Sequence, residues 1–305
     1  MANLPTLVLI TPARNEAEFI EQTIQSMLLQ TVRPIKWVIV SDGSTDGTDE
    51  IVRRYTDNHP WIELIRAPER RERHFAGKVN AFNEGYRRVS DLQYDIIGNL
   101  DADISFDEDH LEYLLNKFVE NPMLGVAGTS YTERDGTIPY DYRFASADNV
   151  PGACQLFRRD CFKDIGGYAA IKGGLIDTVA VLSARMNGWE TRTFTGKMFL
   201  HHRASGTAQT SVLVARFRRG AKSYALGNHP IWEFFRTAYQ MTRKPVVIGA
   251  LAMLSGYLWS VVRRIERPVS DELVAFHRRE QLQKLRQLFT GRWVTGTKTW
   301  EQKTP

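Results

Sequence analysis

Residues 7–44 read LVLITPARNEAEFIEQTIQSMLLQTVRPIKWVIVSDGS. Two runs of four apolar residues, at 7–10 and 37–40, predict buried strands. Between them, apolar residues spaced by three and four predict a helix over about 16–30. The stretch therefore predicts a strand-helix-strand unit in which each strand ends in a polar loop, at 11–16 after the first strand and at 41–44 after the second.

The alternation of strands and helices continues as far as residue 101. It predicts a helix from about 45, a strand at 62–65, a helix near 78–89 and a strand over 95–100. Such alternation is typical of an α/β fold with a doubly wound, mostly parallel sheet, in which ligands bind outside the carboxyl ends of the strands. We therefore expect the loops 11–16, 41–44 and 101–103 to meet in one crevice.

Two carboxylates, Asp101 and Asp103, occupy alternate positions where a predicted strand ends. Carboxylate oxygens suit a hard divalent cation, Mg²⁺ or Mn²⁺, which could bridge the phosphates of a nucleotide and act as a Lewis acid. The alternative is an Asp-rich turn or helix N-cap. Asp107 and Asp109 are expected to serve that second purpose for a helix that continues through residues 111–118.

Four motifs appear in order along the chain: TPARNE at 11–16, VSDGSTDGT at 40–48, GKVNAFNEG at 77–85 and LDAD at 100–103. Over about residues 5–205 the sequence resembles the family 2 glycosyltransferases, which have the GT-A fold. The resemblance implies transfer of a sugar from a nucleotide-diphosphate donor to an acceptor hydroxyl, with inversion at the anomeric carbon. It also implies a catalytic domain at 1–205, followed by a helical extension at 206–305.

The same resemblance assigns donor-binding residues. Asp42 resembles the residue that binds the nucleotide base, and Lys78 a basic residue near the donor; the alternatives are a turn-forming Asp and a solvated Lys. The expected donor-binding set is Thr11, Pro12, Arg14, Glu16, Asp42, Lys78 and Asp101, with Asp103 as a metal ligand.

Asp177 lies eleven residues before Gly188 and Trp189, where the family carries its catalytic base in a Glu-Asp pair. Inversion by single displacement needs such a base to deprotonate the acceptor. The chain departs from the family at Ile176, which stands where the Glu is usual. A helix N-cap is the alternative role for Asp177, and a non-catalytic nucleotide-sugar-binding protein is the alternative function. A sugar-nucleotide pyrophosphorylase is less favoured, because it would have a glycine-rich loop after the first strand.

His201 and His202 follow a strand predicted near 191–194. Members of this fold often carry a histidine here that completes the metal or diphosphate site, and the spacing does not distinguish the two. Both are therefore candidate metal ligands, with two ordinary histidines as the alternative.

The second half of the chain differs in charge from the first. Residues 1–202 hold 22 Lys and Arg against 29 Asp and Glu, whereas residues 203–305 hold 18 against 6. An uncharged segment at 245–262 is flanked by Arg and Lys, and 271–289 has the pattern of a basic amphipathic helix. These features predict association with a membrane surface, either by spanning it or by lying in the interface. A buried soluble helix is the alternative for 245–262.

The composition and the N-terminal sequence exclude several classes of protein and indicate where the protein acts. Two cysteines and 43% hydrophobic residues exclude a disulfide scaffold and a transporter with many spans. No nucleic-acid-binding module surrounds the basic residues, so we expect no nucleic-acid partner. Because the N-terminus has no basic segment typical of a signal peptide, we expect an enzyme at the cytoplasmic face of the cell membrane, making a glycan such as an exopolysaccharide. A processive polymer synthase is less favoured, since it would carry several apolar segments.

Overall fold

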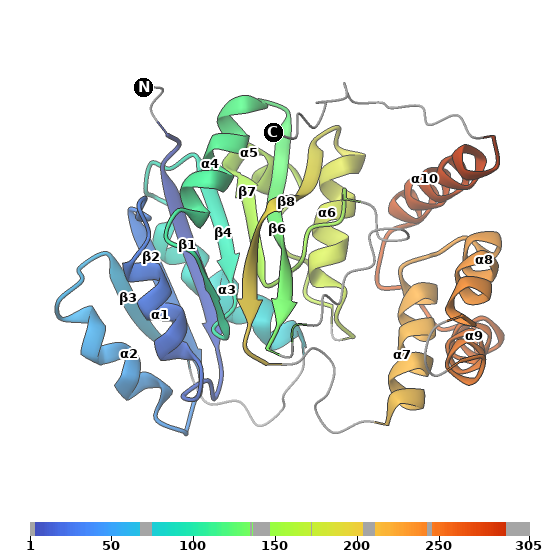
Figure 1. The fold of residues 1–305 in the computed structure, drawn as a ribbon, viewed down its shortest axis with the longest axis horizontal. Helices are drawn as coiled ribbons and strands as arrows, with labels where there is room; N and C mark the ends of the chain where they lie inside the picture. The colour runs from blue at the N-terminus through green and yellow to red at the C-terminus, as the bar shows by residue number, and fades with distance from the viewer. Residues whose placement is uncertain are drawn as a thin grey trace. The chain divides into compact units, whose positions relative to one another are not determined.

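A computed structural model describes residues 4–67, 75–134, 136, 147–171, 173–203, 211–242 and 246–290. The chain folds as two compact units, Met1–Gln209 and Thr210–Pro305. The predicted boundary at 205/206 lies outside the described residues. The first unit contains a sheet with helices, and the described part of the second is helical (Figure 1).

Eight strands form one sheet in the order β3-β2-β1-β4-β7-β6-β8-β5. β1 pairs in parallel with β2 and β4, and β2 pairs in parallel with β3. β7 runs antiparallel between β4 and β6, β8 is parallel to β6, and β5 is antiparallel to β8. The predicted α/β class and mostly parallel sheet are confirmed, and the carboxyl ends of β1, β2 and β4 lie at one edge. The strands are β1 (Leu7–Ala13), β2 (Lys36–Asp42), β3 (Ile62–Ala67), β4 (Ile96–Leu100), β5 (Ile104–Phe106), β6 (Leu124–Glu133), β7 (Cys154–Arg158) and β8 (Glu190–His201).

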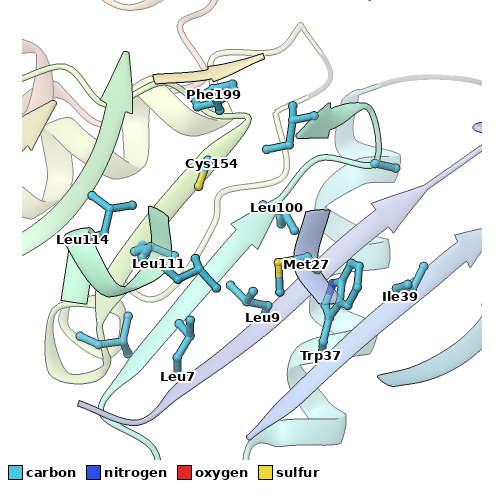
Figure 2. Close-up of a cluster of buried hydrophobic side chains, with 14 of the residues drawn as sticks. Leu7, Leu9, Met27, Trp37, Ile39, Leu100, Leu111, Leu114, Cys154 and Phe199 are labelled. Atoms are coloured by element: carbon cyan, nitrogen blue, oxygen red, sulfur yellow. The ribbon is translucent and has the colours of Figure 1, made fainter. Parts of the chain in front are cut away.

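Each face of the sheet is covered by helices. Leu7 and Leu9 of β1 point to one face and pack with residues of α1 and α4, as Figure 2 shows. Val8 and Ile10 alternate to the other face, where they pack with α3, α5 and α6. This two-sided burial explains why the central strands are continuously apolar. The helices of this unit are α1 (Ile20–Leu28), α2 (Thr48–Thr56), α3 (Phe75–Val89), α4 (His110–Glu120), α5 (Arg159–Asp164) and α6 (Ile176–Met186).

Two helices begin later than the pattern predicts. α1 begins at Ile20 because Glu16 belongs to the preceding loop, where its backbone N–H donates to the Thr48 hydroxyl at 2.9 Å. α2 begins at Thr48, whose backbone N–H donates to Asp46 at 3.1 Å. At α4, Asp109 does occupy the N-cap position, but its carboxylate accepts from Lys197 at 2.6 Å and caps no backbone N–H.

The second unit contains α7 (Val212–Ala225), α8 (Pro230–Gln240), α9 (Ile248–Val262) and α10 (Asp271–Thr290). α7 and α9 approach at two glycines: a Cβ on Gly220 would overlap the carbonyl of Met253, and a Cβ on Gly256 that of Phe217. The apolar segment 245–262 thus forms α9 from residue 248 on, and Pro245 lies outside the described residues. Among the described residues, no helix is both long and apolar enough to cross a membrane.

Candidate active site

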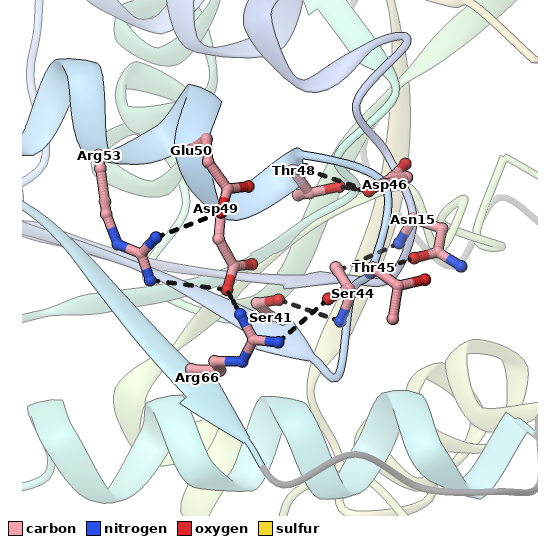
Figure 3. Close-up of polar contacts among 10 residues, drawn as sticks. All are labelled: Asn15, Ser41, Ser44, Thr45, Asp46, Thr48, Asp49, Glu50, Arg53 and Arg66. Carbon is pink, nitrogen blue, oxygen red and sulfur yellow. Dashed lines mark hydrogen bonds and ion pairs between the residues drawn. The ribbon is translucent and has the colours of Figure 1, made fainter.

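The loops after β1 and β2 are hydrogen-bonded to each other, as Figure 3 shows. The backbone N–H of Asn15 donates to the Ser44 hydroxyl at 3.1 Å, and the Asn15 amide oxygen accepts from the backbone of Thr45 at 2.9 Å. Arg66 of β3 holds the second loop from the other side by bonds to Asp49 at 2.6 Å and to the Ser44 carbonyl at 3.3 Å. The two polar loops therefore form one connected wall at the carboxyl edge of the sheet.

Asp42 ends β2 beneath this wall and is almost fully buried. Arg14 of the neighbouring loop approaches it at 3.8 Å, and Gly77 of α3 lies so close that a Cβ there would meet the carboxylate at 3.3 Å. Pro12 lies opposite Val40 in the β1-β2 ladder. Thr11 is different, because it is fully buried. Its hydroxyl accepts a hydrogen bond from the indole N–H of Trp37 at 2.9 Å and so stabilises the core.

An acidic cluster lies where β4 ends. Ligand atoms of Asp101, Asp103 and His201 are all within 4.8 Å of one another. Lys78 donates to Asp101 at 2.5 Å, and Asn99 joins the same carboxylate at 3.2 Å to the Gly152 carbonyl at 2.7 Å. Asn99 was not predicted, although a polar residue inside the apolar strand IIGNL is a signal that sequence reasoning could have used.

Burial and neighbouring charges shift the pKa values of two residues in this cluster. Burial raises the pKa of Asp103, and the neighbouring Asp101 raises it further against the opposing effects of His201, Arg203 and Lys78. Burial acts to lower the pKa of Lys78, but the Asp101 charge and hydrogen bond, helped by Asp177, raise it overall. The carboxylates therefore favour the charged form of the Lys78 ammonium, and a further cation would relieve the repulsion between Asp101 and Asp103.

Arg203 connects this cluster to the loop after β1, and sequence reasoning missed it. Its guanidinium bonds Glu16 at 2.6 Å, lies 3.8 Å from Asp103, and sits over the ring of Phe19 at 5.3 Å. Burial raises the pKa of Glu16 to about 7, although Arg203 acts to lower it. The Arg203 guanidinium thus lies close to the carboxylates of both Glu16 and Asp103.

The two adjacent histidines have different surroundings. His201 is the last residue of β8, and its Nε2 lies 3.5 Å from Asp103. The ring of His202 stacks on Phe19, and its Nε2 lies 3.0 Å from the hydroxyl of Ser105. The structure therefore brings His201 into the acidic cluster and leaves His202 outside it.

Asp177 is the second residue of α6. Leu175, with φ 72°, occupies the N-cap position, so Asp177 lies in the first turn and is not the N-cap. Its side chain touches Gly152, where a Cβ would come within 2.8 Å of the Asp177 Cβ. Gln155, fully buried beneath it, donates to the Val150 carbonyl at 2.8 Å and accepts from Tyr168 at 2.8 Å. Its amide also lies 3.5 Å from the Asp177 carbonyl, so this network, which was not predicted, connects β7 to the first turn of α6.

Ile176 is nearly buried and packs in the cluster that covers one face of the sheet. The residue that stands in place of the usual Glu is therefore part of the core, and Asp177 is the carboxylate left at the start of α6.

The donor set fits a divalent cation. Two carboxylates and one imidazole are ligands that Mn²⁺ accepts, and the carboxylates suit Mg²⁺. The buried Nδ1 of His201 has no hydrogen-bond partner among the described residues, so the ring is not held by a competing acceptor there. Asp101, Asp103 and His201 are the residues that would hold the ion.

The model of the family described as "Glycosyl transferase family 2" matches residues 8–166, which span β1 to α5 and include Asp42, Lys78, Asp101 and Asp103. The chain belongs to glycosyl transferase family 2. Poly-beta-1,6-N-acetyl-D-glucosamine synthases are similar to this family member: that of Staphylococcus epidermidis is 31% identical over 170 residues, and that of Staphylococcus aureus strain COL is 30% identical over the same length. Each match covers 50% of this chain and 39% of the relative, so less than half of each synthase is represented.

Solved structures of related fold support the GT-A arrangement of this family 2 member. A mannosyltransferase from Pyrobaculum calidifontis, in complex with GDP-Man and Mn²⁺, superposes with a TM-score of 0.57 at 20% identity, covering 95% of this chain and 83% of that one. Residues 1–349 of S. aureus TarS, in complex with UDP-GlcNAc, give a TM-score of 0.57 at 14% identity and cover 98% of both chains. At these identities the likeness concerns the fold.

Proposed function

We propose that the protein is an inverting, metal-dependent glycosyltransferase that moves a sugar from a nucleotide-diphosphate donor to a hydroxyl of a glycan or lipid-linked acceptor in cell-surface polysaccharide synthesis. The observation that supports this most is the cluster of Asp101, Asp103 and His201 beside Lys78, at the strand edge where ligands of such sheets bind.

The donor half of the site follows from the connected loops. In this proposal Asp42 and Arg14, which lie 3.8 Å apart, bind the nucleoside, and Glu16 lines the same wall. The Lys78 ammonium, which stays charged because its pKa is raised, binds developing negative charge on the diphosphate. Bound Mg²⁺ or Mn²⁺ would supply Lewis-acid stabilisation of the leaving nucleoside diphosphate.

The acceptor half centres on Asp177. Its carboxylate accepts the proton of the attacking hydroxyl as the new glycosidic bond forms and the bond to the diphosphate breaks. Gly152 leaves room for this side chain, and its carbonyl is tied through Asn99 to Asp101. In this proposal the base and the donor site are thus linked through Gly152, Asn99 of β4 and Asp101.

The acceptor and the setting are inferred from two features. The similar Staphylococcus proteins are polysaccharide synthases by name. Residues 203–305 are strongly basic, which suits anionic lipid headgroups. We therefore place the reaction at the cytoplasmic face of the cell membrane.

The test is release of nucleoside diphosphate from a panel of UDP-, GDP- and dTDP-sugars with Mg²⁺ or Mn²⁺, in detergent extracts supplied with membrane lipid as acceptor. We expect one donor to react in the wild type and neither Asp103→Ala nor Asp177→Asn to turn it over. Asp107→Asn is the matched control, because this exposed carboxylate lies just after β5, outside the cluster, and its ion pair is with Lys197.

Donor binding, measured separately by calorimetry, separates the roles. Asp177→Asn should bind the donor like the wild type, whereas Asp103→Ala should bind it more weakly. Tight binding with no turnover by the wild type against any acceptor would instead favour a non-catalytic nucleotide-sugar-binding protein, the function that the missing Glu at position 176 suggests.

A further inference from the structure

Helix α9 has two apolar faces. One face packs inside the second unit and contains Gly256, which approaches α7. The other face is exposed, although no charged residue occurs anywhere in the helix. The exposed apolar residues follow each other at helical spacing along one side: Ile248 (60%), Leu251 (50%), Leu258 (50%), Trp259 (46%) and Val262 (79%).

This stripe runs the length of a helix of 15 residues, which is about 22 Å. Soluble surfaces tolerate single exposed apolar side chains, but a row of them along a helix marks a contact surface, and here only the exposed Ser255 interrupts the row, between Leu251 and Leu258. The length is short of the roughly 30 Å of a hydrocarbon core. The buried face also contacts α7 backbone to backbone, so the helix would have to leave its own unit in order to span a bilayer.

The charges around the stripe indicate what covers it. Gly220 lies against Met253 and Phe217 lies against Gly256, so α7 runs antiparallel to α9. The exposed apolar turn at the start of α7 therefore lies near the end of α9, where the exposed Arg263 places its guanidinium 5.9 Å from the ring centre of Trp259. Arg264, the next residue along the chain, is also exposed.

A second copy of this chain would bring two such basic surfaces together. An anionic lipid surface is complementary to them, and an exposed apolar row that ends in a Trp and two Arg suits the headgroup region of a bilayer, while α7 covers the opposite apolar face of the helix. We propose that α9 is a membrane-docking helix whose exposed stripe inserts into the headgroup region of an anionic bilayer while the flanking arginines bind lipid phosphates. The proposal extends the membrane setting of the proposed function, but lipid binding itself requires no turnover.

Flotation of the full chain with vesicles tests the proposal. We expect binding to phosphatidylcholine vesicles that contain 30 mol% phosphatidylglycerol, weak binding to phosphatidylcholine alone, and weakening by 0.5 M NaCl. The double variant Leu251→Ser/Leu258→Ser should lose at least tenfold in partitioning with an unchanged thermal unfolding midpoint. The matched control is Leu29→Ser/Met123→Ser, which removes equally exposed apolar side chains from the first unit and should bind like the wild type.

The depth to which α9 inserts into the bilayer and the oligomeric state of the protein test the proposal independently. Brominated lipids should quench tryptophan fluorescence in the wild type, and this quenching should decrease in Trp259→Phe. Equal vesicle binding by the wild type and the Leu251/Leu258 variant would overturn the proposal. So would a dimer in light scattering that the double variant converts to a monomer while lipid binding stays the same.

The glycosyltransferase proposal can fail separately. Asp177→Asn should bind vesicles like the wild type whatever its activity is. A protein that binds anionic vesicles but turns over no donor would refute the proposed reaction and leave the docking helix supported.

Discussion

Adding one methyl group at Gly152 should impair catalysis strongly while changing the stability of the fold only slightly. An alanine Cβ there would lie 2.8 Å from the Cβ, 2.9 Å from the Oδ2 and 3.0 Å from the Cγ of Asp177. Ordinary carbon contacts are about 3.5–4.0 Å, so either the Asp177 side chain or the 152 backbone must move by roughly 1 Å. Displacing a catalytic group by about 1 Å can cost on the order of 100-fold in rate.

We therefore expect Gly152→Ala to lower kcat about 100-fold, because either movement separates the base from the acceptor hydroxyl. Local overpacking should lower the free energy of unfolding by no more than about 1–3 kcal/mol. The assay is nucleoside diphosphate release at saturating donor, together with urea unfolding of the same preparation. Gly173→Ala is the matched control, because a Cβ there meets nothing within 4 Å. A kcat for Gly152→Ala within threefold of the control would refute the placement of Asp177 as the base.

Three further predictions follow from the charges and the helix packing. An exposed ion pair is worth up to about 1 kcal/mol, so Arg203→Gln, which removes a cation 3.8 Å from Asp103, should strengthen Mn²⁺ binding roughly fivefold in calorimetry; weaker binding would argue against competition. The pKa of Glu16 is raised from 4.5 to about 7, so the folded protein retains a proton that the unfolded chain loses between these values. Glu16 therefore destabilises the metal-free protein progressively as pH rises from about 4.5 to 7, and Glu16→Gln should gain melting temperature over the wild type at pH 8 but not at pH 4; a pH-independent difference would contradict the shift. Gly256→Ala should destabilise the α7-α9 pair by about 1–3 kcal/mol in thermal unfolding, because its Cβ overlaps the Phe217 carbonyl, and an unchanged midpoint would contradict this packing.

The parallel half of the sheet could be predicted because its signals are local. The apolar runs of β1, β2 and β4 and the amphipathic helices between them each lie within one short stretch of chain. The antiparallel half could not be predicted in the same way. β7 is inserted between β4 and β6 by pairings that no periodicity records, and residues 154–158 were not predicted as a strand.

The choice between the two histidines shows why part of the site was beyond sequence reasoning. The register of β5 and β8 sets Ile104 opposite His201, and this pairing brings His201 beside Asp103. Successive residues along an extended chain point to opposite sides, so His202 is directed to Phe19 instead. Spacing along the sequence gives no information on this register, because β5 and β8 are distant in the chain.

The charges of Glu16, Arg203, Asp103 and Asp101 form a continuous path from the loop that lines the nucleoside wall to the cluster that would hold a cation. In the proposed reaction, Arg203 would be repelled by a divalent ion held by Asp103, and its guanidinium would then be available to the diphosphate of the donor. Because linkage is reciprocal, a donor that attracts Arg203 must strengthen cation binding by the same factor. The proposed roles therefore predict cooperative binding, in which the cation and the nucleotide each bind more tightly when the other is present.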